Sequence, residues 1–147
     1  MLVKTKHFGE IDLAPDKVIT FEKGIFGFEE YKKYTILFNS ENKETVVSWL
    51  QSLDEPSLAL PIINPFLVKP DYNPNVSEQT LKELGELNDE NTVVYTTLTV
   101  PSEVEKMTAN LKAPIIINAD TKKGYQVVAE NEEYAVKYSV YEKLKKK

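Results

Sequence analysis

Few side chains in this sequence have the types and spacing that catalysis requires. The chain has no cysteine, so cysteine nucleophiles, disulfides, iron–sulfur clusters and thiolate zinc sites are excluded. Its single histidine, His7, stands beside Phe8, where a structural or solvated role explains it better than a serine–histidine pair. No Walker loop, Rossmann fingerprint or calcium-binding loop occurs. We therefore expect no catalytic residue, no cofactor and no bound metal.

The carboxylates are abundant, but their positions favour turns over acid–base catalysis. Asp54 and Glu55 are adjacent, and adjacent side chains on a strand point to opposite faces. Pro56 follows them, which favours a loop. Other acids fall in predicted loops near asparagine or proline, namely Asp71, Asp89, Glu90 and Asp120. A hydrolase remains an alternative, and it would need two carboxylates converging in one pocket.

The charge of the chain favours a basic protein partner over a nucleic acid. The formal net charge is −5, from 23 acidic and 18 basic residues, and none of the basic residues is arginine. Phosphate backbones attract lysine and arginine, and arginine is the usual bidentate group for phosphate. An acidic surface suits a basic protein, although solubility alone would also explain it. The alternative function is a small β-barrel nucleic-acid-binding module, which would need a basic face with exposed aromatic residues.

One aromatic stretch, residues 21–29, stands out from its surroundings. It holds three phenylalanines, at positions 21, 26 and 28, and two glycines, Gly24 and Gly27. Glycine permits positive φ or close backbone approach, and phenylalanine buries a large apolar area. The glycines have the spacing of a KH-type RNA clamp, but the neighbouring residues are aromatic and acidic rather than basic. The stretch is either a tight corner between strands or an exposed loop that contacts a partner.

Short β-branched and aromatic segments separated by turn residues predict a mainly β fold. We expect about nine short strands and one or two short helices, arranged as an antiparallel pseudo-barrel or sandwich. The last segment, 134–141, has tyrosines at helical spacing, but its alternation and β-branched content favour a strand. The candidate strands are 2–5, 11–13, 18–21, 34–38, 46–52, 58–63, 92–100, 115–117, 125–129 and 134–141.

Three local signals refine this pattern. Asn75 and Glu78 have capping-box spacing, so a short helix should begin there and end near Gly85. Pro61 lies inside an apolar strand and indicates a bulge or an unpaired edge, because proline cannot donate to a sheet ladder. Ser102 and Glu105 are spaced to cap one helical turn.

The chain is predicted to form one compact domain over residues 1–142, followed by a disordered lysine-rich tail over 143–147. The N-terminus lacks the apolar region of a signal peptide, and no apolar run approaches the length of a membrane span. We therefore expect a cytoplasmic protein without a membrane partner.

Taken in order, the motifs resemble those of the FliW family of bacterial flagellar assembly factors. Each motif is modest alone, whereas the ordered set is specific and covers nearly the whole chain. The matching residues are 5–11, 19–21, 24–29, Tyr31, Tyr34, 49–52, Asp54, Glu55, 58–60, 64–66, Tyr72, 110–111, 113–115, 117–118 and 126–127.

The resemblance implies a regulatory protein without catalytic activity and without a small-molecule substrate or direct nucleic-acid contact. Family members bind the RNA-binding translational repressor CsrA, relieve its repression of flagellin translation, and are held by newly made flagellin. CsrA would lose RNA affinity either by occlusion or through a shifted conformation, and the resemblance favours the non-competitive effect. The family fold is a compact, mainly antiparallel pseudo-barrel.

Candidate partner-binding residues are those that a fold alone explains least well. They are Phe26, Phe28, Glu29, Asp54, Glu55, Asn64, Pro65, Phe66, Asp71 and Tyr72. A structural role is an equal alternative for each of them. One testable form of the hypothesis is that Asp54→Lys combined with Glu55→Lys weakens CsrA binding without unfolding the protein.

Overall fold

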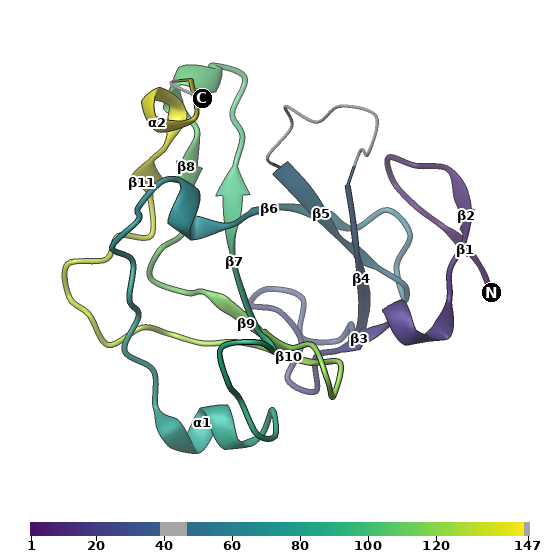
Figure 1. Ribbon diagram of the computed structural model, residues 1–147. Coiled ribbons are helices and arrows are strands. Elements are labelled where there is room, and N and C mark those ends of the chain that lie inside the picture. Colours follow the sequence, from purple (N-terminus) through teal and green to yellow (C-terminus); the bar gives the residue numbers. More distant parts are fainter. Residues whose placement is uncertain (39–46, 146–147) are drawn as a thin grey trace.

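The computed structural model describes residues 1–38 and 47–145, and within these ranges seven strands form a closed barrel (Figure 1). Around the barrel the order is β7-β6-β5-β4-β3-β10-β9, and pairing of β7 with β9 closes it. The prediction of a mainly β pseudo-barrel is confirmed. The bounds are β3 Ile19–Thr20, β4 Lys33–Leu37, β5 Val47–Ser52, β6 Ala59–Ile63, β7 Thr92–Thr99, β9 Ile115–Asn118 and β10 Lys123–Gln126.

The barrel pairings are antiparallel except at one place. β10 meets β3 in parallel through Lys123 and Thr20, which departs from the expected antiparallel arrangement. This contact is a single residue pair, and it needs no crossover helix because β3 and β10 belong to different hairpins. β3 pairs antiparallel with β4, and β10 pairs antiparallel with β9.

Short elements extend the barrel on several sides (Figure 1). β8 and β11 continue the sheet beyond β7, and β1 and β2 form a separate N-terminal hairpin. Figure 1 shows α1 below the barrel and α2 at its top, beside the C-terminus. The bounds are β1 Leu2–Lys4, β2 Glu10–Asp12, η1 Pro15–Lys17, η2 Pro65–Leu67, α1 Glu78–Lys82, η3 Val104–Lys106, β8 Thr108–Ala109, β11 Tyr138–Ser139 and α2 Tyr141–Lys145.

The helix predicted after Asn75 forms, but its N-terminal cap is misplaced in the prediction. α1 spans Glu78–Lys82 and its N-cap residue is Ser77, without a side-chain cap hydrogen bond. Asn75 does not serve as the cap because its backbone is bound elsewhere: its N–H donates to Asn131 and its carbonyl accepts from Glu130. Gly85 takes a φ of +88° just beyond the helix, as its predicted terminating role requires.

The C-terminal strand predicted over 134–141 is wrong for most of its length. β11 covers only Tyr138–Ser139, and α2 begins at Tyr141. Tyr134 lies in a turn where it packs against Tyr72, which removes it from any strand alternation. α2 runs through Lys145, so the first part of the tail expected to be disordered over 143–147 is helical, and residues 146–147 lie outside the described residues.

The barrel interior is filled by large apolar side chains. Phe21, Tyr34, Leu50 and Ile62 have no solvent exposure and belong to one hydrophobic cluster. Phe21 and Tyr34 meet edge to face, with ring centroids 5.4 Å apart. Gly124 leaves room for this arrangement, since a Cβ atom there would lie 2.5 Å from the Phe21 ring. Within the described residues, no helix has the length and hydropathy needed to cross a membrane.

Candidate functional site

The acidic residues considered for catalysis serve as local hydrogen-bond acceptors on separate loops. Asp54 accepts from two backbone N–H groups, Asp71 pairs with the Lys69 ammonium at 3.2 Å, and Asp120 accepts from an asparagine amide at 3.0 Å. Across residues 1–38 and 47–145, no group of three or more histidine or acidic side chains could hold a metal ion.

The stretch 21–29 is largely a structural corner. Phe21 is buried inside the barrel, and Phe28 packs partly against the same cluster. Gly24 takes a φ of +69°, and a Cβ atom there would lie 2.5 Å from the Glu29 Cα, so this turn requires glycine. Phe26 is the phenylalanine that faces solvent, with 48% exposure, and its N–H donates to Gln126 at 2.9 Å.

The end of this corner meets the loop that holds Asp54 and Glu55. The Asp54 carboxylate accepts from the N–H groups of Lys32 at 2.9 Å and Lys33 at 3.2 Å. The Lys32 ammonium in turn donates to the Glu29 carbonyl. The structure thus brings together two groups of predicted contact residues that lie far apart in the sequence.

Glu29, Glu30, Asp54 and Glu55 form what we call the acidic edge. Partial burial, followed by the carboxylates of Glu30, Glu55 and Asp54, raises the pKa of the Tyr31 hydroxyl, which places that hydroxyl within the field of these acids. Glu29, Glu30 and Asp54 are exposed and Glu55 is half-buried. This edge offers negative charge beside a tyrosine.

The predicted residues in segment 64–72 divide into structural and exposed members. Asn64 accepts from the Phe66 N–H at 3.0 Å, Pro65 is buried, and the Tyr72 hydroxyl donates to the Leu111 carbonyl at 2.6 Å. Phe66 remains 42% exposed, with its ring edge to face on Tyr72. Asp71 is also exposed. Asn64 is exposed as well, so Asn64, Phe66 and Asp71 are the members that a partner can reach, whereas Pro65 and Tyr72 are buried.

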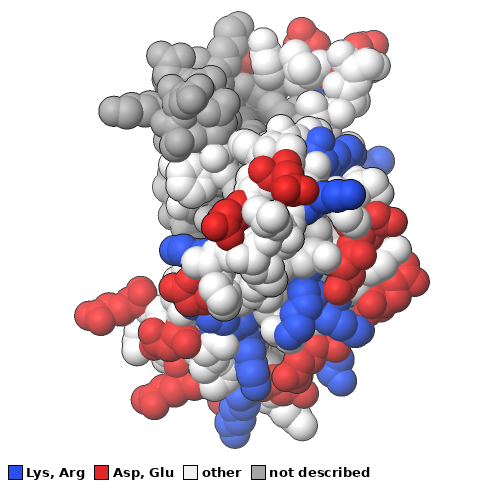
Figure 2. Space-filling view, turned by 90° about the vertical axis from the view of Figure 1, so that its right-hand side faces the viewer, with Lys and Arg blue, Asp and Glu red and all other residues white. Residues whose placement is uncertain are grey.

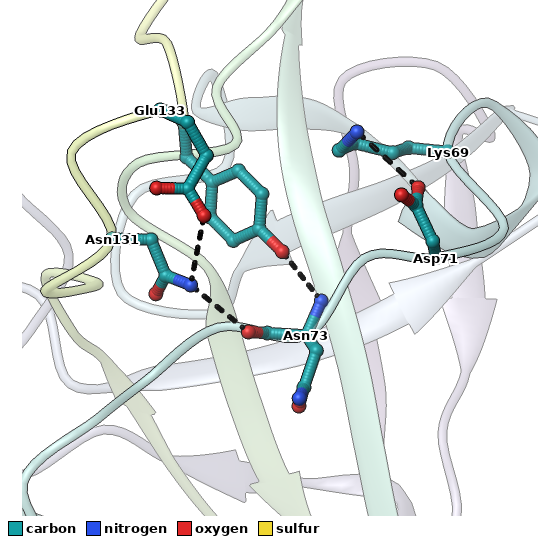
Figure 3. Close-up of polar contacts among 6 residues, drawn as sticks. Lys69, Asp71, Asn73, Asn131 and Glu133 are labelled. Atoms are coloured by element: carbon teal, nitrogen blue, oxygen red, sulfur yellow. Dashed lines mark hydrogen bonds and ion pairs between the residues drawn. The ribbon is translucent and has the colours of Figure 1, made fainter.

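Polar clamps hold the chain that follows this segment (Figure 3). The Asn73 N–H donates to the Tyr134 hydroxyl at 2.7 Å, and the Asn131 amide donates to the Asn73 carbonyl at 3.2 Å. The Asn131 side chain also accepts from the Asn75 N–H at 2.6 Å. The long irregular segment is thereby fixed to residues more than fifty positions away.

Sequence reasoning missed an apolar groove on the outer surface of the barrel. Its volume is about 650 Å³, and it lies between the N-terminal hairpin and η3. The His7 ring stacks on Trp49, with centroids 4.1 Å apart, and Val100 and Val104 remain exposed. We call this the Trp49 groove. A signal was available, since Val100 and Val104 are apolar residues on either side of Pro101, where the predicted strand ends.

The charge distribution gives no support to the nucleic-acid alternative on the face shown in Figure 2. There, the described lysines and carboxylates are interspersed rather than gathered into one basic area. A phosphate backbone would require a basic stripe with aromatic side chains along it.

Comparison with known proteins supplies the family. A sequence model of the family described as FliW protein matches residues 2–140. The flagellar assembly factor FliW of Lachnoclostridium phytofermentans is 58% identical over 145 residues, covering 98% of this chain and 93% of that protein. The flagellar assembly factor FliW of Lachnospira eligens is 52% identical over 148 residues, covering 99% and 98%.

The fold agrees with these relationships. A crystal structure of the flagellar assembly factor FliW superimposes with a TM-score of 0.86 at 33% sequence identity, covering 96% of this chain and 97% of that one. Sequence and structure agree over nearly the whole length. This chain belongs to the FliW family of flagellar assembly factors.

Proposed function

We propose that this protein binds the translational repressor CsrA, antagonises its repression of flagellin translation, and also binds flagellin. The observation that carries the proposal is the family match over residues 2–140. The role is regulatory and non-catalytic, and it is exercised in the cytoplasm on protein partners. The formal charge of −5 suits a basic RNA-binding partner, because opposite charges steer association.

For the CsrA contact we propose the acidic edge together with the exposed Phe26. The edge brings together carboxylates from two loops. The exposed Phe26 ring adds apolar surface for a protein partner to bury. Phe66 and Asp71 form a second exposed pair, which we propose as a further contact. Pro65, Phe28 and Tyr72 would then support these contacts from within the fold, and the exposed Asn64 would hold the Phe66 backbone.

The antagonism is proposed to be non-competitive with RNA. Binding at a site separate from the RNA would lower RNA affinity through a changed CsrA conformation, and the coupling must be reciprocal. Occlusion would instead forbid a ternary complex.

Calorimetry of this protein with CsrA, with and without saturating flagellin-leader RNA, tests both statements. We expect binding without RNA, weaker binding with RNA, and a detectable ternary complex. Equal affinities for CsrA with and without RNA would contradict the proposed antagonism. Weaker binding with RNA, but without a ternary complex, would indicate occlusion and not allostery. Absence of heat, with a negative pull-down, would remove CsrA as the partner. Titration with monomeric flagellin tests the second partner in the same way.

The structure identifies a better double variant with which to test the acidic edge. Lysine at position 54 would remove the acceptor of two backbone N–H groups, whereas Glu55 accepts from one, the Ser57 N–H at 3.3 Å, so Glu30→Lys with Glu55→Lys is the better pair. Glu132→Lys with Glu142→Lys makes the same charge change at exposed positions elsewhere. We expect the first pair to weaken CsrA binding by about tenfold and the second to have a much smaller effect. Equal losses of affinity in the two variants would mean that the overall charge of the protein, and not the acidic edge, determines CsrA binding.

A further inference from the structure

The Trp49 groove exists because β6 and β7 separate beside Pro61. Pairing of these strands covers only Ile62 with Thr97 and Ile63 with Thr96. The Ser52 N–H donates to the Leu58 carbonyl, which sets the alternation of the β5–β6 ladder. With that alternation, the backbone groups of Ala59 and Pro61 face β7. Pro61 has no N–H to donate there, so the ladder ends.

Among the described residues, the separation leaves an open edge on β7 and its continuation. The Thr97 carbonyl accepts from the Asn110 N–H on the side away from β6, so the backbone groups of Leu98 and Val100 face the groove. Pro61 cannot donate to the Leu98 carbonyl. Val100 follows the strand, is 52% exposed, and forms no backbone hydrogen bond to any other described residue. Such an edge accepts an added strand.

The floor and walls beside this edge are apolar. Trp49 and Pro61 face each other across β5 and β6, and both line the groove. Val104 adds an exposed side chain on the η3 side. A strand placed along the Leu98–Val100 edge would direct every second side chain toward one face of the sheet.

The two elements beside the groove, the N-terminal hairpin and η3, carry side chains of opposite charge that form no ion pair with described residues. On the hairpin side, Lys6 lines the groove and is exposed, with no carboxylate within ion-pair distance among residues 1–38 and 47–145. On the η3 side, Glu105 directly follows the groove-lining Val104 without itself lining the groove. It is exposed and forms no ion pair among the same residues, whereas Glu103 binds Lys106 at 3.2 Å. A complementary segment would carry an acidic group toward Lys6 and a basic group toward Glu105.

We propose that the Trp49 groove binds an extended segment of a protein partner, which adds to the Leu98–Val100 edge as a strand. The segment alternates apolar and polar residues and bears one acidic and one basic side chain. The proposal does not depend on CsrA or flagellin being the partner, and it is tested without either.

The test uses a synthetic peptide, acetyl-Glu-Val-Thr-Leu-Thr-Val-Lys-amide, and the fluorescence of Trp49. Trp49 is the only tryptophan in the chain, so a change in its emission reports directly on the groove. We expect saturable binding. A peptide of the same composition with its three apolar residues placed together should bind about tenfold more weakly.

Two methylated peptides test strand addition. One carries N-methyl groups on both threonines, and the other carries them on the valines and leucine. Alternate N–H groups of a strand face opposite edges, so one of these peptides should lose about tenfold or more in affinity while the other loses much less. Equal losses, or none, would contradict strand addition.

Val100→Asp tests the position, with Val136→Asp as the matched control. The two valines have similar exposure, 52% and 58%, and Val136 does not line the groove. The first substitution should abolish the fluorescence change while the second preserves it. Lys6→Glu should weaken binding of the original peptide, and replacing the peptide's glutamate by lysine should restore it.

Three results would overturn the proposal. They are a peptide that produces no saturable change, a change that Val100→Asp leaves intact, and a dimer of the free protein that Val100→Asp dissociates. Light scattering across a concentration series detects the dimer, in which case a second copy of the chain occupies the groove.

Discussion

The barrel interior and the outer layer, which we define as residues 64–75 and 130–134, are stabilised in different ways. Inside the barrel, Phe21 and Tyr34 are fully buried, and the Tyr34 hydroxyl has no hydrogen-bond partner among residues 1–38 and 47–145. In the outer layer, the Tyr72 hydroxyl donates to a backbone carbonyl, and Asn131 bonds to two distant backbone groups. Shape and apolar area hold the first region, whereas in the second, hydrogen bonds to distant backbone groups add to the packing of Tyr72 and Tyr134. Substitutions should therefore act through volume in one and through lost polar partners in the other.

The largest expected effect is loss of volume inside the barrel. Phe21→Ala should lower the free energy of unfolding by about 3–5 kcal/mol, because it empties a fully buried site. Phe26→Ala, five residues away and 48% exposed, should cost less than about 1 kcal/mol. Urea denaturation of both variants measures the difference. Similar losses would mean that packing does not distinguish the two sides of the corner.

The next effect concerns the polar clamp of the outer layer. Asn131→Ala should destabilise the protein by about 1–3 kcal/mol, because it removes an acceptor and a donor that bind the Asn75 N–H and the Asn73 carbonyl. Asn75→Ala is the control, since the Asn75 side chain is exposed and forms no hydrogen bond with described residues. The denaturation curve of Asn131→Ala should have a clearly lower midpoint than that of Asn75→Ala. Coincident curves would mean that the Asn131 hydrogen bonds do not contribute to stability.

Removal of a tyrosine hydroxyl should have a smaller effect on stability, and the effect should differ in direction between Tyr72 and Tyr34. Tyr72→Phe removes the bond to the Leu111 carbonyl and should cost about 1 kcal/mol. Tyr34→Phe removes a buried hydroxyl that has no partner, so stability should stay the same or rise by up to about 1 kcal/mol. Thermal and urea unfolding measure both. Destabilisation by Tyr34→Phe would reveal a partner for that hydroxyl.

The smallest expected effect is a loss of stability at alkaline pH. Burial, followed by Asp54 and Tyr31, raises the pKa of Tyr34 from 10.0 to about 12, and burial also raises the pKa of Tyr72. The folded state keeps these protons after the unfolded state has lost them. Stability should therefore be constant below pH 10 and fall as pH rises toward 12. Unfolding midpoints over this range measure the slope, which Tyr34→Phe should reduce.

Most barrel strands could be predicted because each carries its own signal, whereas β10 was predicted at 125–129 and is Lys123–Gln126. The β-branched run of β7 and the apolar run of β9 favour strands through their own composition, and the turn residues between strands set the spacing. Pro61 also indicated correctly where pairing would stop, because the missing N–H is a property of the residue itself.

The candidate site was less predictable from the chain. Asp54 and Tyr72 were candidates for partner contact, yet distant backbone groups occupy one carboxylate oxygen of Asp54 and the hydroxyl of Tyr72. His7 was set aside as structural or solvated, yet its ring completes the wall of the Trp49 groove. Each of these roles depends on residues far away in sequence, and no local pattern encodes them.

By itself, the sequence determined the class of fold, the absence of thiol chemistry, the acidic charge and the ordered motifs that place the chain in its family. These depend on composition and local periodicity. The tertiary structure alone decided that the corner and the Asp54 loop share one edge, and that Tyr134 leaves the predicted strand to clamp Asn73. It also decided that a groove opens beside Pro61. The physical reason is that a surface is made of residues brought together by long-range pairing, and pairing is a property of the whole barrel.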